Sequence, residues 1–199
     1  MKTAREDSPT KTRLLEAAER LMLAKGYAAT TVEEICKTAK LTKGSFFHYF
    51  DSKDDLGKVL LERFCASAAQ LHAACCGVER DPRARVYNYI DATIKMSQDP
   101  TMSKGCLLGT FAQELCEDYP QIKQVCEQGF KAWADQFGEE LARAKARYAP
   151  KAAFVPREVA EYFIAVVEGS LILAKAQGDT KVVGRTLRQF RTYVTSLLK

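Results

Sequence analysis

Apolar residues recur every three to four positions along almost the whole chain, which is the period of an amphipathic α-helix. The stripes nearest the two ends show this pattern clearly: Leu14, Ala18, Leu21 and Met22, then Leu187, Phe190, Val194 and Leu197. No run of alternating apolar and polar residues lies between turn residues, so β-strands are not expected. The sequence therefore predicts an all-α fold of about nine helices.

Prolines, glycines and capping residues divide this pattern into separate helices. Ser8 followed by proline has the form of a helix start, and Gly26 has the form of a helix end. A long helix is expected to begin at Lys53. We place a domain boundary there, which gives a three-helix domain over residues 1–52 and a larger helical domain over residues 53–199.

The stretch TTVEEICKTAKLTKGSFFHYFDSK contains two short helices joined by a tight turn. Thr31 and Glu34 form a Thr-x-x-Glu capping box at the start of the first helix. The turn follows at Lys40, where a left-handed backbone would cost a lysine about 1 kcal/mol. Thr42 can cap the second helix. This arrangement is typical of a helix-turn-helix, whose second helix enters the major groove of DNA.

The charges along this stretch also favour DNA binding. Between residues 36 and 50 there are three lysines and one histidine but no carboxylate, whereas acidic residues crowd on both sides. Positive charge is thus concentrated where a phosphate backbone would lie. Ser52 can cap the next helix, so Lys53 combines an ammonium group with a helix N-terminus and is expected to bind a phosphate. Phe46 and Phe50 share a helix face and are expected in the core.

These motifs resemble the DNA-binding domain of TetR-family transcriptional regulators over roughly residues 9–60. The resemblance lies in a Gly-Tyr-x-x-Thr-Thr opening, a Lys-Gly-Ser centre and a Phe-x-x-Phe-x-Ser-Lys end. It implies a homodimeric regulator, most often a repressor, that reads a palindromic operator in double-stranded DNA. Phe47 stands where the family usually has tyrosine, so a hydroxyl-to-phosphate bond is not available there. The expected DNA contacts are Thr31, Lys43, Gly44, Ser45, Phe47, His48, Tyr49 and Lys53.

Composition sets the remaining limits. The chain has 199 residues, of which 47% are hydrophobic and 28% charged, and its net charge is +5, as is ordinary for a globular protein. It contains no run of eighteen apolar residues and no apolar signal segment, so we expect a cytoplasmic protein without a membrane partner. The seven cysteines form no CxxC pair. His72-x-x-Cys75-Cys76 is too weak a cluster to assign a metal site, and no cofactor is expected.

Two expected helices near the C-terminus, over about residues 156–177 and 180–197, carry more apolar residues than one half-buried face needs. A glycine in the first of them permits a close approach between helices. We interpret the surplus as a homodimer interface, a four-helix bundle across a two-fold axis, which the family resemblance also implies. The expected interface residues are Val159, Phe163, Val167, Gly169, Leu171, Leu187, Phe190 and Val194.

A candidate sensor of the regulator is the segment Gly105-Cys106-Leu107, which opens a helix after a polar loop. A thiol at a helix N-terminus beside Lys104 should have its thiolate form favoured by the helix dipole and by the cation. This segment resembles a hallmark of the TetR subgroup that contains the N-ethylmaleimide-responsive repressor and other electrophile- and oxidant-responsive repressors. The resemblance implies that Cys106 is the sensor, and that Lys175 can lie near it and trap its oxidised form.

Other interpretations stay open at this point. Cys106 also fits a simple packing role, because most buried cysteines are inert. A non-covalent aromatic or lipophilic effector is the alternative, in a pocket lined by Phe111, Tyr119, Trp133 and Phe163, although such stripes are also ordinary core. A thiol-dependent enzyme is a third class. With only two histidines and no GxSxG, Walker or GxGxxG motif, the general base has no candidate, so catalytic residues are not expected.

Overall fold

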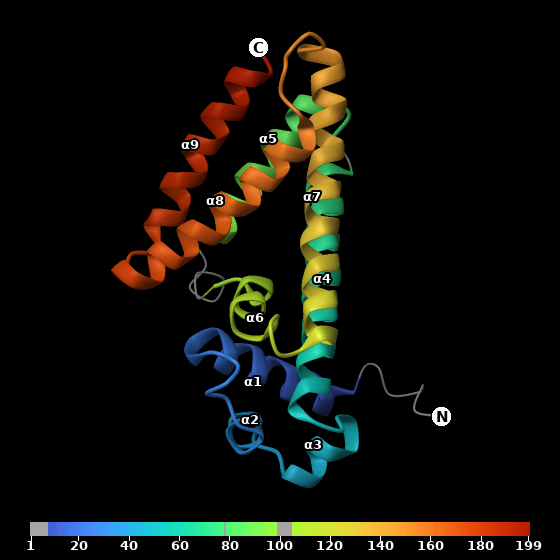
Figure 1. The fold of residues 1–199 in the computed structure, drawn as a ribbon, viewed down its shortest axis with the longest axis vertical. Helices are drawn as coiled ribbons and strands as arrows, with labels where there is room; N and C mark the ends of the chain where they lie inside the picture. The colour runs from blue at the N-terminus through green and yellow to red at the C-terminus, as the bar shows by residue number, and fades with distance from the viewer. Residues whose placement is uncertain (1–7, 78, 99–104) are drawn as a thin grey trace. The chain divides into compact units, whose positions relative to one another are not determined.

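The computed structural model describes residues 8–77, 79–98 and 105–199, and every regular element in these ranges is an α-helix (Figure 1). The prediction of an all-α fold is therefore confirmed. No helix of the described ranges is both long enough and apolar enough to cross a lipid bilayer. The nine helices in these ranges are α1 (Pro9–Lys25), α2 (Val32–Ala39), α3 (Lys43–Tyr49), α4 (Lys53–Cys76), α5 (Pro82–Met96), α6 (Leu107–Leu115), α7 (Pro120–Tyr148), α8 (Pro156–Gln177) and α9 (Lys181–Leu197).

The chain divides into two compact units, and the long helices α4 and α7 each pass from one unit to the other. The first unit contains the described residues up to Cys65 together with Leu107–Glu127. The second unit contains Ala66–Cys106 and Gln128–Lys199. The boundary expected from the sequence lies at residue 52, whereas this division gives the start of α4 and the whole of α6 to the N-terminal unit. The reason is that α6 packs against α1.

Local signals in the sequence account for the short helices of the first unit. The Glu34 N–H donates to Thr31 Oγ1 at 3.2 Å and the Thr31 N–H donates to Glu34 Oε2 at 3.0 Å, so both halves of the predicted capping box are present. The rings of Phe46 and Phe50 lie 5.5 Å apart and are buried, as predicted. Burial of each contributes about 1.5–3 kcal/mol to folding. The same core includes Leu14, Ala18, Met22, Ile35 and Leu56.

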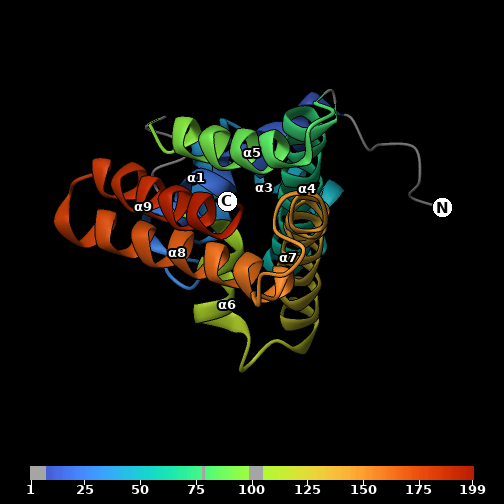
Figure 2. The same cartoon turned by 90° about the horizontal axis from the view of Figure 1, so that it is seen from above.

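The core of the second unit is built around buried aromatic rings. Helix α9 packs against both α5 and α8, and Figure 2 shows these three helices side by side. The Phe163 ring of α8 lies 4.8 Å from the Phe137 ring of α7 and 5.1 Å from the Phe190 ring of α9. Tyr89 of α5 lies 5.8 Å from Phe163. Such ring pairs contribute about 0.5–1.5 kcal/mol each beyond their buried area, so this cluster fixes how the four helices pack.

Candidate functional site

The segment between α2 and α3 has the geometry of a helix-turn-helix. Lys40 ends α2 in the left-handed conformation, with φ 54° and ψ 48°. Its N–H donates to the Lys37 carbonyl at 3.1 Å, and the Leu41 N–H donates to the Cys36 carbonyl at 2.9 Å. These bonds satisfy carbonyl groups at the end of α2 in the way a left-handed cap does. The left-handed backbone anticipated at Lys40 is therefore present.

Helix α3 carries six of the residues that the sequence assigned to DNA. Thr42 Oγ1 accepts a hydrogen bond from the Ser45 N–H at 3.1 Å and caps the helix, as predicted. Phe47 is 53% exposed, an unusual exposure for a phenylalanine on a short helix. Of the six, Lys43, Gly44, Phe47 and His48 are exposed, and Ser45 and Tyr49 are half-buried. The exposed side of α3 is thus the side that the sequence assigned to DNA.

Gly44 leaves an open space on this side of α3. A Cβ atom added there would meet only Thr42 Oγ1, at 3.6 Å, which is ordinary contact. Glycine inside a helix costs about 1 kcal/mol relative to alanine. Because no packing contact within the described part of the chain requires glycine here, the missing side chain fits a close approach by a ligand backbone.

Several of the assigned side chains have partners within the protein. Lys43 forms an ion pair with Glu33 of α2, and this pairing holds the pKa of Glu33 below its ordinary value. Both side chains are well exposed, and exposed pairs of this kind contribute little, so a phosphate can replace the carboxylate. The Tyr49 hydroxyl hydrogen-bonds to Ser8 Oγ at 2.8 Å. Thr31 is occupied by its capping box, so its role at DNA would rest on its exposed position at the start of α2.

Lys53 joins the start of α4 to the loop between α1 and α2. Its Nζ donates to the carbonyls of Tyr27 at 3.1 Å and Thr30 at 3.0 Å, and lies 4.1 Å from the centre of the Tyr27 ring. Burial lowers the pKa of Lys53. Ser52 caps α4 as predicted, since its Oγ accepts from the Asp55 N–H at 3.0 Å. An ammonium group has three donors, and the two carbonyls use two of them, which leaves one for a phosphate.

Helix α6 packs on the same loop, a contact that sequence reasoning missed. The Ala28 N–H donates to Glu114 Oε2 at 3.1 Å, and the Phe111 ring lies 5.2 Å from the Tyr27 ring. A Cβ atom at Gly57 of α4 would lie 3.2 Å from Tyr27 and 3.3 Å from Phe111, so glycine lets these rings fit. The only local signal of this contact is that glycine, which interrupts an otherwise apolar face of α4.

Cys106 directly precedes α6 and is 8% exposed. Its thiol donates a hydrogen bond to the carboxylate of Glu168 on α8; burial raises the pKa of Glu168 and this bond opposes the rise. Lys175 is exposed and lies seven residues further along α8, about 10 Å along the helix axis. Lys104 lies outside the described residues. Next to the thiol there is thus a carboxylate, which the sequence did not indicate.

The four aromatic residues proposed to line an effector pocket fall into two groups. Phe111 and Tyr119 belong to the first unit, where their rings lie 5.2 Å and 6.4 Å from that of Tyr27. Trp133 and Phe163 belong to the second unit, and their rings lie 6.2 Å apart. Phe111 and Phe163 are fully buried. These two rings occupy core positions, whereas Tyr119 is exposed and Trp133 is half-buried.

Most of the residues of α8 and α9 that were expected to form the dimer interface are buried within their own subunit. A side chain that is already removed from solvent within its own subunit has no area to lose when two subunits meet. These residues therefore belong to the core of the second unit, where Phe163 is the central ring. The six corrected positions are Val159, Phe163, Val167, Leu187, Phe190 and Val194.

The apolar residues that remain exposed lie on the opposite side of α8. Tyr162, Ile172 and Leu173 are about half exposed on this helix, and Tyr193 is exposed on α9. Gly169 lies between them, and a Cβ atom there would meet nothing within 4 Å. Of the expected interface residues, Gly169 and the half-buried Leu171 retain accessible surface. These residues leave apolar surface exposed on this side of α8.

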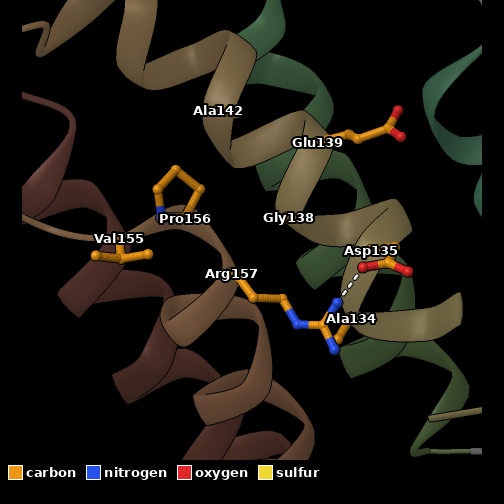
Figure 3. A pocket seen from close by; sticks show the side chains of 8 residues that line it. All are labelled: Ala134, Asp135, Gly138, Glu139, Ala142, Val155, Pro156 and Arg157. Carbon is orange, nitrogen blue, oxygen red and sulfur yellow. Dashed lines mark hydrogen bonds and ion pairs between the residues drawn. The ribbon is translucent and has the colours of Figure 1, made fainter. Parts of the chain in front are cut away.

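An open groove of about 410 Å³ lies between α7 and the start of α8. Figure 3 shows the residues that line it. Arg157 forms an ion pair with Asp135 at its edge. Ala134, Gly138 and Ala142 form its floor on α7. None of the residues proposed as sensors from the sequence lines this groove, so it is distinct from the effector site that the sequence suggested.

A capped helix-turn-helix with a carboxylate-free second helix, on an all-helical chain, defines a DNA-binding regulator. Residues 14–58 match the family described as bacterial regulatory proteins, tetR family. Residues 82–190 match the family described as tetracyclin repressor-like, C-terminal domain. The chain belongs to the TetR family of transcriptional regulators.

Relatives and solved structures agree with this assignment. The chain is 24% identical over 192 residues to the HTH-type transcriptional repressor DhaR of Mycobacterium sp. (strain GP1), covering 96% of this chain and 93% of DhaR. It is 29% identical over 189 residues to the HTH-type transcriptional repressor NemR of Escherichia coli (strain K12), covering 94% of each. The crystal structure of the reduced form of E. coli NemR has the same fold, with a TM-score of 0.79 over 96% of this chain and 99% of that one, at 23% identity.

Proposed function

We propose that the chain is a homodimeric repressor that binds a palindromic operator through α3 and leaves it when Cys106 is modified. The observation that carries the trigger is the position of α6. This helix starts directly after Cys106, and its body packs on the loop between α1 and α2. A displacement at one end of a rigid helix therefore reaches the helix-turn-helix at the other end.

In this proposal the exposed side of α3 enters the major groove. Lys43 exchanges Glu33 for a phosphate, and Lys53 offers its remaining donor to a second phosphate. Each phosphate contact releases counterions, so loss of one contact flattens the salt dependence of binding by about one unit. Lys53→Ala should flatten the slope, whereas Lys58→Ala, on an exposed lysine of the same helix, should leave it unchanged. An unchanged slope in both variants would remove Lys53 from the interface.

In the proposed dimer, the two subunits meet through the exposed apolar residues of α8. Regulators of this family act as dimers, and here Tyr162, Ile172 and Leu173 each leave about half of their apolar surface exposed in a single subunit. Two copies that join through α8 and α9 would form a four-helix interface around a two-fold axis. The two α3 helices then read half-sites one DNA turn, about 34–36 Å, or a multiple of it apart.

The trigger is an addition to the Cys106 sulfur. With a maleimide, the sulfur bonds to one alkene carbon and the thiol proton ends on the neighbouring carbon, so no further reactant is needed. At 8% exposure, most of the surface of Cys106 is already packed against its neighbours. Because protein interiors are closely packed, the added atoms must displace the first turn of α6.

The experiment measures release from DNA by fluorescence anisotropy, with a labelled fragment selected for binding from a random library. Wild-type protein, Cys106→Ser and the matched control Cys116→Ser are each treated with N-ethylmaleimide. Cys116 is a half-buried thiol just after the end of α6. Release is expected for the wild type and for Cys116→Ser, and not for Cys106→Ser. Equal release of all three proteins would contradict the covalent trigger at Cys106.

The same assay separates the covalent trigger from a non-covalent effector. A panel of aromatic and lipophilic compounds without reactive groups is titrated against the wild type and Cys106→Ser. The covalent proposal expects no release by any of them. Release that survives in Cys106→Ser would instead identify a binding pocket and would leave the DNA-binding part of the proposal intact.

A further inference from the structure

Three side chains with metal-binding atoms meet in the interior of the second unit. His72 and Cys76 lie one turn apart on α4, and Glu140 reaches them from α7, which runs beside α4 (Figures 1 and 2). The Cys76 Sγ and His72 Nε2 atoms are 3.8 Å apart, and a carboxylate oxygen of Glu140 completes a group whose atoms lie within 4.8 Å of one another. Cys76 is 1% exposed and Glu140 is 2% exposed.

Two arginines form ion pairs with the carboxylate of Glu140. Arg85 of α5 donates to Glu140 Oε1 at 2.7 Å, and Arg143 of α7 donates to the same oxygen at 3.1 Å. The other oxygen, Oε2, is buried and has no hydrogen-bond partner among the described residues. A buried carboxylate oxygen without a partner costs about 1–3 kcal/mol or more, so its persistence in a core needs an explanation.

We propose that His72, Cys76 and Glu140 bind one divalent cation of the zinc class, with the fourth position open to water or a small ligand. Zinc takes sulfur, nitrogen and oxygen ligands together, and sites with three protein ligands and one open position are common. Zn–S and Zn–N bonds of about 2.3 Å and 2.0–2.1 Å at a tetrahedral angle put the two ligand atoms about 3.6 Å apart. The observed separation of 3.8 Å is close to this value.

The groups around the site have opposite effects on its affinity for a metal ion. The Arg85 and Arg143 guanidinium groups fix the carboxylate in the way that outer groups fix metal ligands, which favours binding. Their positive charges also repel a cation. The Cys76 thiol must release its proton to the solvent when the metal binds. We therefore expect a weaker site than a closed four-ligand zinc site, and this proposal does not depend on the role of Cys106.

The test uses reduced, chelator-treated full-length protein titrated with Co²⁺ and then with Zn²⁺. The wild type should bind one Co²⁺ per subunit with a thiolate-to-cobalt charge-transfer band, and Zn²⁺ should abolish the band. Cys76→Ser should lose it, whereas the matched control Cys75→Ser, which changes the neighbouring thiol outside the group, should keep it. A wild type without the band, or a band that Cys76→Ser retains, would overturn the proposal.

A second variant guards against loss of structure in the buried cysteine variant. His72 is only half-buried, so His72→Asn should keep the fold, as checked by helical circular dichroism. Loss of a group outside the ligand shell lowers metal affinity about 10–100-fold, and loss of a ligand should lower it at least as much. A folded His72→Asn protein with wild-type affinity for Zn²⁺ would show that the imidazole is not a ligand and would sink the three-ligand site.

Discussion

Replacement of Lys40 by glycine should stabilise the protein. Lys40 is held at φ 54° and ψ 48°, a conformation that costs an L-residue about 1–2 kcal/mol and costs glycine nothing. Glycine also makes the unfolded chain more flexible, which takes back about 0.4–1 kcal/mol. The net gain is about 0.5–1 kcal/mol. For a chain of this length, that gain raises Tm by about 1–4 °C.

Lys37→Gly is the matched control for this change. Lys37 is also exposed, and its replacement by glycine removes the same charge. Lys37 lies inside α2, however, where glycine destabilises a helix by about 1 kcal/mol. The two variants should therefore shift Tm in opposite directions. Thermal unfolding is followed by circular dichroism at one fixed protein concentration, because association makes Tm depend on concentration. Shifts of the same sign would refute the backbone argument, since charge and composition are identical in the two variants.

Three further predictions follow from the same structure. Gly44→Ala should raise Tm by a few degrees, through about 1 kcal/mol of helix propensity, and weaken binding to every DNA fragment because its methyl group fills the open space on α3. Glu34→Gln should lower stability at pH 7, and its difference from the wild type should vanish as pH falls from about 4.5 towards 2 in urea titrations, because Lys25 holds the pKa of Glu34 at about 2. Ile172→Glu should shift the dimer to monomer in analytical ultracentrifugation, whereas Val155→Glu, at a similarly exposed apolar position that lines the groove of Figure 3, should not.

Features of the N-terminal unit that depend on near neighbours were predictable from the sequence. The capping box of Thr31 and Glu34, the Thr42 cap and the Ser52 cap each join residues three positions apart, and all are present. The positive φ of Lys40 followed from its place in a helix-turn-helix. Their recognition needs only the local pattern, because each is satisfied within one turn of helix.

The side of α8 that stays exposed was not predictable in the same way. Helix α8 is apolar on most of its circumference, so periodicity alone does not show which of its sides faces the core of its own subunit. Phe163 and Val167 turned out to fill the core, and Tyr162 and Ile172 stay exposed. The ring cluster around Phe163 decides this, and it joins residues from four helices far apart in the chain.

Long-range contacts also account for what was missed at the two candidate sites. Glu114 contacts Ala28, which lies 86 positions earlier in the chain. Glu140 of α7 lies next to His72 of α4, and two further helices separate them in the sequence. The sequence shows only one histidine near two adjacent cysteines at this place. The carboxylate of Glu140 joins them because α7 packs on α4. The spacing of residues within one segment cannot predict a contact between two distant segments.

The contact between Glu168 and Cys106 is also a long-range contact, and it leads to a prediction about the Cys106 thiol. The Cys106 thiol donates to the Glu168 carboxylate. A negative charge at this position would oppose formation of a thiolate, which is the reactive form of a cysteine. Glu168→Gln keeps the volume and removes the charge, and Cys106 should then react faster with iodoacetamide at pH 7, as measured by mass spectrometry of its peptide.

The stability of Glu168→Gln provides an independent check of the same charge. Burial raises the pKa of Glu168, so the wild type should lose stability as pH rises through this raised pKa, whereas the glutamine variant should not. If that pH dependence is observed and Cys106 nevertheless reacts more slowly in the variant, the carboxylate removes the thiol proton during the reaction. Glu168 would then activate the sensor rather than restrain it, and the low exposure of Cys106 alone would limit its reactivity.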